Sequence, residues 1–218
     1  MNGKKLVALI AEGESTVLEF KRKAVSPQKI AKEITAMVNT KGGYLLVGVD
    51  DDGTIVGVRS EKTEMDILQT ACNIWIEPAV EASFEIVPVY DKDVVLCYVE
   101  QGKSKPYKLR IEEPDGKVTF KAYIRVGEKS IEASREMTRL LTYQSQETKS
   151  LTLSIGHNEK KLFAYLEKYE RATVSDFAKL VNISNRRAER LLIRLVRAGV
   201  ILIHNDDTRD YFYLADPK

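Results

Sequence analysis

The alternation of apolar and polar residues between residues 13 and 57 predicts a strand, a helix and a second strand. Residues 16–21 alternate with a period of two, which is typical of a strand with one apolar face. Ser26-Pro27 predicts the start of a helix, and Gly42-Gly43 predicts its end. The nearly continuous apolar run from Tyr44 to Val49 predicts a strand that is covered on both faces.

The rest of the first 147 residues predicts further helices and strands in irregular order. A mixture of this kind favours an α+β fold with a mixed sheet over a repeat architecture. We therefore expect an α+β domain over residues 1–147. Helical spacing is found at residues 60–75 and 133–146, and β-rich runs are found at 82–90, 94–99 and 118–126.

Polar and small residues at 148–156 predict a linker, and the pattern changes beyond it. Residues 157–218 predict three short helices followed by a β-hairpin. This order matches the winged helix-turn-helix plan, in which the last helix can enter the major groove of DNA. We therefore expect a second α+β domain over residues 157–218.

The third of these helices, near residues 185–198, carries five arginines and one acid, Glu189. Such a stripe binds phosphates if it is exposed, whereas the alternative is a solvated helix or a dimer surface. A basic loop at residues 101–108 adds a further cation. The residues that we expect to contact nucleic acid are Asn185, Arg186, Arg187, Arg190, Arg194 and Lys105.

Composition limits the class of protein. Of the 218 residues, 44% are hydrophobic and 30% are charged, as in soluble globular proteins, and the net charge of +2 means that any nucleic-acid surface is local. No apolar run approaches the roughly 20 residues that span a bilayer, and the N-terminal apolar stretch is too short for a secretory signal. We expect a cytoplasmic protein without a membrane partner. Cys72 and Cys97 lie in apolar contexts and indicate buried free thiols.

Carboxylates gather around the first two predicted strands. Glu14 lies in the turn before the first strand, Glu19 lies on that strand, and Asp50 and Asp51 follow the second. Pairing of these strands would bring the acids to one sheet edge. Such a cluster repels itself unless a cation or a base such as Lys21 lies within it. The alternative is an ordinary acidic turn beside a solvated strand face, because Asp-Asp-Asp-Gly is common turn chemistry.

A series of short motifs runs through the first domain. They are GES at 13–15, EFK at 19–21, NTKGG at 39–43, GVDD at 48–51, KPY at 105–107 and YIRVG at 123–127. Together they resemble the Schlafen AlbA-2 domain, also called the divergent AAA-4 domain, over about residues 10–145. Bacterial members of this family commonly carry a C-terminal winged helix and are described as transcriptional regulators.

The resemblance implies two functions in different classes. The first is a transcriptional regulator that binds DNA through the winged helix and requires no cofactor. Its AlbA-2 domain would serve nucleic-acid binding, sensing or assembly. We favour this reading because the layout is regulatory. No GxxxxGK[ST] phosphate loop is found in the sequence, so the sequence does not support ATP binding.

The second function is a metal-dependent endonuclease acting on RNA or single-stranded nucleic acid, as in some animal Schlafens. The resemblance places its three carboxylates on Glu14, Glu19 and Asp51, which would hold Mg²⁺ or Mn²⁺ while Lys21 stabilises developing charge. The animal enzymes build an RNA groove from two such lobes. A single-lobe chain would need to form a homodimer to supply the second.

Overall fold

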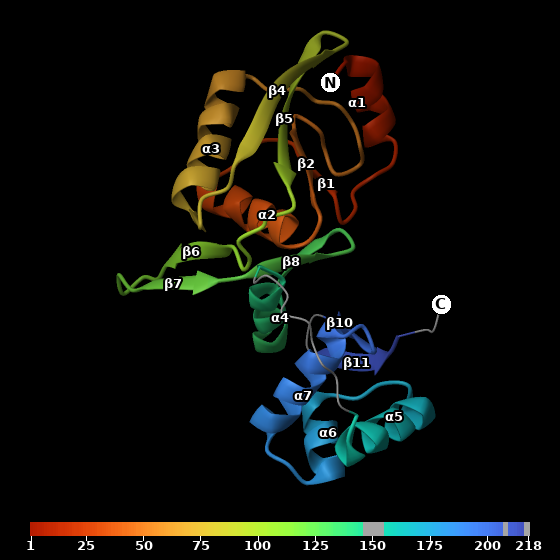
Figure 1. Ribbon diagram of the computed structural model, residues 1–218. Helices are drawn as coiled ribbons and strands as arrows, with labels where there is room; N and C mark the ends of the chain where they lie inside the picture. Colours follow the sequence, from red (N-terminus) through yellow and green to blue (C-terminus); the bar gives the residue numbers. More distant parts are fainter. Residues whose placement is uncertain (146–154, 207–208, 216–218) are drawn as a thin grey trace. The chain divides into compact units, whose positions relative to one another are not determined.

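The computed structural model describes residues 1–145, 155–206 and 209–215. Contacts divide the chain into two compact units, Met1–Ala133 and Ser134–Lys218 (Figure 1). Each unit combines helices and strands, which confirms the predicted α+β class. Most of the predicted linker at 148–156 lies outside the described residues. In the described part of the chain, no helix is long and apolar enough to cross a membrane.

The first unit is built on a mixed sheet of strand order β1-β2-β5-β4, in which β1 and β2 are parallel and the other pairs are antiparallel. Two smaller sheets, β3-β6-β7 and β8-β9, complete it. Its helices are α1 (Gly3–Ile10), α2 (Pro27–Asn39) and α3 (Glu61–Ile74). Its strands are β1 (Leu18–Lys21), β2 (Gly42–Val47), β3 (Ile76–Glu77), β4 (Ala82–Val89), β5 (Lys92–Glu100), β6 (Lys108–Glu112), β7 (Val118–Lys121), β8 (Tyr123–Val126) and β9 (Lys129–Glu132).

The predicted strand, helix and strand are present, and α2 is the crossover that a parallel pair requires. The Ser26 side chain accepts a hydrogen bond from the Lys29 amide and caps α2, as predicted. The predicted end of this helix is wrong by a few residues. Its C-cap is Thr40, and Gly42 already belongs to β2.

The predicted strand at 118–126 is two strands, because its halves pair with different partners. β7 pairs with β6, whereas β8 pairs with β9, and Ala122 stands between them. The Ala122 carbonyl accepts a hydrogen bond from the Ala133 amide at 2.8 Å, which returns the chain to this point after β9. Periodicity within one segment carries no information on this change of partner.

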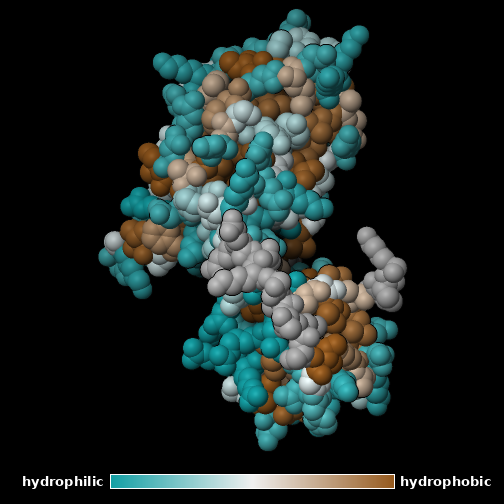
Figure 2. Space-filling model, viewed as in Figure 1, coloured by the Kyte–Doolittle hydropathy of each residue, from teal (hydrophilic) through white to brown (hydrophobic). Residues whose placement is uncertain are grey.

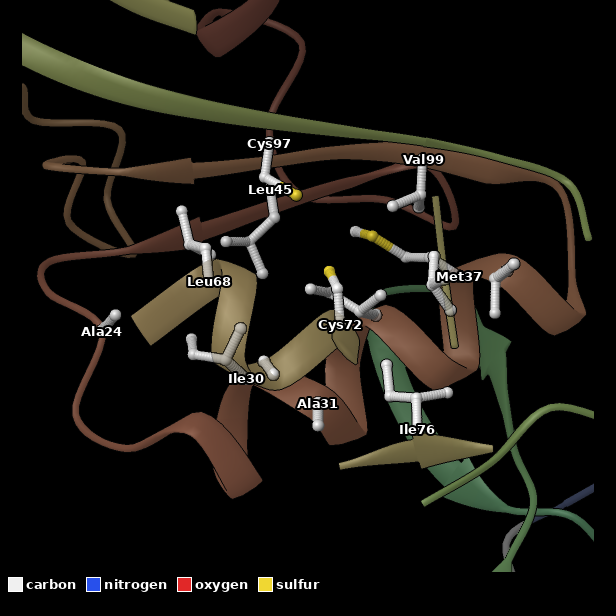
Figure 3. Packing of buried hydrophobic residues seen from close by; sticks show 14 of the residues in the cluster. Ala24, Ile30, Ala31, Met37, Leu45, Leu68, Cys72, Ile76, Cys97 and Val99 are labelled. Atoms are coloured by element: carbon white, nitrogen blue, oxygen red, sulfur yellow. The ribbon is translucent and has the colours of Figure 1, made fainter. Parts of the chain in front are cut away.

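Apolar residues cover both faces of the main sheet, as the run at 44–49 predicted. Leu45 faces one cluster with α2 and α3, while Leu46 faces the other with α1 and Phe20. Alternate residues of a strand point to opposite faces, so one strand supplies both cores. Figure 3 shows the first cluster, in which Cys72 and Cys97 are buried free thiols, as predicted.

The second unit contains three helices followed by an antiparallel hairpin, in the predicted order, with a further helix before them. Its core is a single apolar cluster that includes Leu162, Phe177, Leu192 and Phe212. The elements are α4 (Arg135–Ser145), α5 (His157–Tyr169), α6 (Val174–Val181), α7 (Asn185–Arg197), β10 (Ile201–Asn205) and β11 (Asp210–Leu214).

Helix α4 groups with the second unit, whereas the sequence pattern predicted that residues 133–146 end the first domain. Two buried acids of the second unit explain this grouping, because a buried carboxylate needs a partner. The carboxylate of Glu189 on α7 lies 2.5 Å from the Arg139 guanidinium of α4. The Asp210 carboxylate accepts a hydrogen bond from the hydroxyl of Ser134, the residue that precedes α4.

We predict that Arg139→Met destabilises the second unit by about 2–3 kcal/mol, because it leaves the Glu189 carboxylate buried beside a distant cation. Urea unfolding followed by far-UV circular dichroism measures the loss. Fluorescence of Trp75, the single tryptophan, reports on the first unit, and the urea midpoint that it measures should not change. Arg135→Met is the matched control, since Arg135 lies 3.9 Å from Glu189 and is largely exposed. Equal losses in the two variants would contradict the role given to Arg139.

Candidate functional site

The first candidate site is the carboxylate cluster at β1. Glu14 lies in the turn before this strand, and its Oε1 accepts a hydrogen bond from the Phe20 amide at 2.8 Å. This bond folds the GES motif back along β1. The Lys21 ammonium group pairs with the Glu19 carboxylate and also donates to the Phe20 carbonyl at 2.9 Å. The structure therefore brings Glu14, Glu19 and Lys21 together.

Glu19 is buried, with 5% of its surface exposed, and both of its carboxylate oxygens face cations. Oε1 pairs with Lys21, and Oε2 accepts from the Arg125 guanidinium at 2.6 Å. The Arg125 side chain on β8 is completely buried. A buried carboxylate is stabilised only by such partners, so Arg125 is the counter-ion that permits Glu19 in this strand.

Arg125 contacts several other parts of the first unit. Its Nη2 donates to the Ser15 carbonyl at 2.6 Å, and its Nη1 lies 3.3 Å from the Glu33 carboxylate of α2 and 3.2 Å from the Ser130 hydroxyl of β9. Arg125 is not among the site residues predicted from the sequence. The sequence does contain a signal for this role, because Arg125 is the one charged residue of β8 and of the YIRVG motif.

The NTKGG motif connects the same region to the KPY loop. The Asn39 side-chain amide donates to the carbonyls of Tyr107 and Tyr123, at 2.8 and 2.9 Å, and its oxygen accepts from the Tyr107 amide at 2.8 Å. Gly43 has a φ of 148°, and a Cβ on it would lie 2.3 Å from the Val17 carbonyl oxygen. The glycine is therefore required by the close approach of β2 to the chain before β1.

The acids of the cluster repel one another. Burial raises the pKa of Glu14, and the charges of Glu19 and Asp51 raise it further, against the opposing effects of the Phe20 amide and Lys21. Burial lowers the pKa of Lys21, but its hydrogen bond and ion pair with Glu19 outweigh this, so the pKa is raised. Ionisation of Glu14 is therefore less favourable in the folded protein than in water.

The residues present do not fit a three-carboxylate metal centre in this arrangement. Within residues 1–145, 155–206 and 209–215, no group of three or more His, Cys, Asp or Glu side chains could hold a metal ion. Asp51 is exposed, and both oxygens of Glu19 face the protein's own cations. Binding of Mg²⁺ or Mn²⁺ by Glu14, Glu19 and Asp51 stays a prediction.

The second candidate site is the N-terminal half of α7. The Ser184 side chain caps this helix, and Asn185, Arg186, Arg187 and Arg190 are all exposed. None of the ion pairs found among the described residues involves these three arginines. The apolar side of α7 packs into the core of the second unit, so the arginines are directed to solvent.

Two further cations predicted to bind nucleic acid have structural partners. Arg194 is half-buried and pairs with the buried Glu159 of α5 at 3.0 Å. Lys105 is 5% exposed, its amine lies 3.4 Å from the Thr40 carbonyl, and burial lowers its pKa. As folded, Lys105 is not a surface contact, because the loop at 101–108 packs against α2. The sequence of a basic loop does not show which of its lysines are buried in the folded protein.

Comparisons with known proteins match both units. The family model Schlafen, AlbA_2 matches residues 14–134, and the PCI domain model matches residues 157–213. A solved N-terminal domain of a protein related to the ATP-dependent DNA helicase RecG, from Nitrosomonas europaea, is 24% identical with a TM-score of 0.45. The match covers 59% of this chain and 91% of that one. The DIP2311 protein from Corynebacterium diphtheriae is 18% identical with a TM-score of 0.46, over 88% of this chain and 35% of that one.

We predict that Arg125→Met destabilises the first unit by about 3–5 kcal/mol, because it leaves Glu19 and Glu33 without their buried cation. Urea unfolding followed by Trp75 fluorescence measures the loss. The double variant Glu19→Leu with Arg125→Met removes both charges and should recover a large part of it. Arg22→Met is the control, since Arg22 forms an exposed pair with Asp50. If the loss in the double variant equals the sum of the losses in Glu19→Leu and in Arg125→Met, the two residues are not coupled.

We predict that Glu14→Gln stabilises the protein at neutral pH and not at about pH 4. A carboxyl group with a raised pKa binds its proton more tightly in the folded state. Its cost to stability is therefore absent while both states are protonated, and it grows as the pH rises through the raised pKa. The glutamine carbonyl can still accept from the Phe20 amide.

Melting temperatures of Glu14→Gln and of the parent, measured across this pH range, test the prediction. Glu12→Gln, at the exposed neighbouring acid, is the control and should change stability by less than Glu14→Gln at neutral pH. A Glu14→Gln variant that is less stable than the parent at neutral pH would refute the electrostatic account.

Proposed function

The chain belongs to the Schlafen AlbA_2 family over residues 14–134, and from this membership and the surface of α7 we propose that it is a DNA-binding transcriptional regulator. The second unit makes the principal DNA contact. The AlbA_2 unit assists by nucleic-acid binding, sensing or assembly.

The observation that carries the proposal is the exposed arginine cluster at the start of α7. Arg186, Arg187 and Arg190 lie within five residues, and the described residues offer them no carboxylate partner. With a net charge of only +2 for the whole chain, this cluster is a local concentration of positive charge. Figure 2 shows hydrophilic surface over the side of the second unit where α7 lies.

The arrangement of the elements supports the interpretation of the second unit as a winged helix-turn-helix. The C-cap of α6 is Asn182, which adopts the left-handed conformation, and α7 begins three residues later. The β10-β11 hairpin follows α7 in the position of a wing. In this plan the N-terminal residues of the last helix approach the base edges of the major groove.

The side chains at the start of α7 suit duplex DNA. Arginine pairs with phosphates and with the two acceptors of guanine, and asparagine pairs with adenine. We assign phosphate and base contacts to Asn185, Arg186, Arg187 and Arg190. Arg194 is not among them, since it pairs with Glu159.

A second candidate function is the endonuclease, which the convergence of Glu14, Glu19 and Lys21 with the nearby charge of Asp51 favours. A divalent cation there would supply Lewis-acid chemistry. Glu14 and Asp51 would be its available ligands, since Lys21 and Arg125 already pair with Glu19. RNA would be the substrate, and a homodimer would supply a second lobe. We place this function second because the donor set does not fit a three-ligand centre as folded.

We predict that Arg187→Gln and Arg190→Gln each weaken binding to a duplex DNA pool and lower the slope of log K against log salt by about one. Each variant removes one phosphate contact and the counterion that it releases. Fluorescence anisotropy at several salt concentrations measures both quantities.

Lys161→Gln is the matched control for these variants. It removes the same charge from an exposed position on α5 and should leave the slope unchanged. If the α7 variants and the control behave alike, α7 does not contact the DNA and the proposal fails.

A further inference from the structure

A hollow beside the carboxylate cluster, lined in part by Asp51, has no role in the DNA binding proposed for α7. Its volume is about 630 Å³, within the range of small-ligand sites. It is bounded by α1, the Asp51-Asp52-Gly53 turn and the turn that joins β4 to β5. Figure 1 shows α1 beside the end of β4, and the two elements are in contact.

The hollow combines an apolar floor with an exposed aromatic ring. Val7, Ile10, Phe20 and Ile55 supply apolar lining. Tyr90 also lines it and is 82% exposed, which makes it the most exposed large hydrophobic residue of the described chain. An aromatic side chain left in water beside an apolar hollow offers a face on which a planar ligand can stack.

The hollow is lined by both acidic and basic side chains. Asp51 and Asp52 are its acids, and within the described residues the Asp51 carboxylate has no hydrogen-bond or ion-pair partner. Lys92 lines the same hollow, where its ammonium group donates to the Ile55 carbonyl at 2.7 Å and keeps further hydrogens for a ligand. Lys4 lines a smaller hollow of about 340 Å³ that shares Val7 and Tyr90 with it. A ligand that lies across Tyr90 would therefore meet acceptors in the larger hollow and an ammonium group in each of the two.

The two hollows together form a groove that passes Tyr90. We propose that this groove binds one unpaired nucleotide of a single-stranded nucleic acid, with a base that carries an exocyclic amino group. The base stacks on Tyr90, and its amino group donates to the Asp51 carboxylate, as cytosine N4 does to acidic side chains. The phosphate lies toward Lys92 and Lys4. The complementarity of charge along the groove selects this occupant.

Other ligands fit the groove less well. A base within a duplex is stacked on its neighbours and cannot present its face to Tyr90. A keto base such as thymine offers an acceptor where Asp51 also offers acceptors, so the two repel. A purely basic partner would satisfy Asp51 and Asp52 but would meet Lys92 and Lys4.

Anisotropy with fluorescent octamers of deoxycytidine and of thymidine tests the proposal on the full chain. All measurements use a protein that also carries Arg187→Gln and Arg190→Gln, so that α7 does not dominate the binding. Failure of the DNA-binding proposal is then distinguished from failure of this one. We expect the cytidine octamer to bind about tenfold more tightly than the thymidine octamer. Tyr90→Asn should weaken binding of the cytidine octamer by about tenfold, whereas Tyr90→Phe, which keeps the ring, should not weaken it.

The substitutions are chosen to leave the fold intact. Tyr90 has a φ of 51°, a conformation that asparagine tolerates, so Tyr90→Asn removes the ring without new backbone strain. Phe120→Ser, at an exposed aromatic of β7, is the matched control and should have no effect. Asp51→Asn should reduce the ratio of the affinities for the two octamers, because an amide can donate to the thymine carbonyl.

Several results would overturn the proposal. They are equal binding of the two octamers, retention of binding in Tyr90→Asn, and equal loss in Phe120→Ser. Binding of free cytidine monophosphate as tightly as the octamer would assign the groove to a free nucleotide. A melting shift with an arginine-rich peptide and none with the octamer would assign it to a basic protein partner.

Discussion

The first unit depends on one buried ion pair, between Glu19 of β1 and Arg125 of β8. The Arg125 side chain is completely buried, so its charged guanidinium group needs acceptors within the protein. Glu19, Glu33, Ser130 and the Ser15 carbonyl are those acceptors, and they come from four different segments. The pair therefore holds the GES turn, β1, α2 and the β8-β9 hairpin in one arrangement.

This constraint divides the acids of the cluster into two kinds. Glu19 is held from both sides by Arg125 and Lys21, and it serves as an anchor. Glu14 and Asp51 remain available, and their mutual repulsion contributes to the raised pKa of Glu14. The same edge of the unit carries the groove beside Tyr90, to which Asp51 contributes. The ligand site that we propose therefore lies next to an acid that the protein's own cations neutralise.

In the second unit, the packing of α7 determines which of its arginines are available. The helix buries Leu192, Leu195 and the carboxylate of Glu189, so its remaining sides are fixed relative to the core. The C-terminal half is then covered, because Arg194 pairs with Glu159 and Arg197 stacks on Tyr143 of α4, 4.4 Å from its ring. Only the N-terminal half presents unpaired arginines in the described part of the chain.

The sequence by itself determined the local elements and the motifs. Apolar periodicity and caps located α2, β2, α3, α7 and the final hairpin, because these signals depend on residues close together in the chain. The sequence also brought Glu14, Glu19 and Lys21 into one hypothesis. It did not identify Arg125, whose partner Glu19 is 106 positions away, nor the burial of Lys105 and the pairing of Arg194. Only the tertiary structure decided these, because burial and ion pairing depend on which distant segments meet, and a charged residue has the same identity whether it is solvated or enclosed.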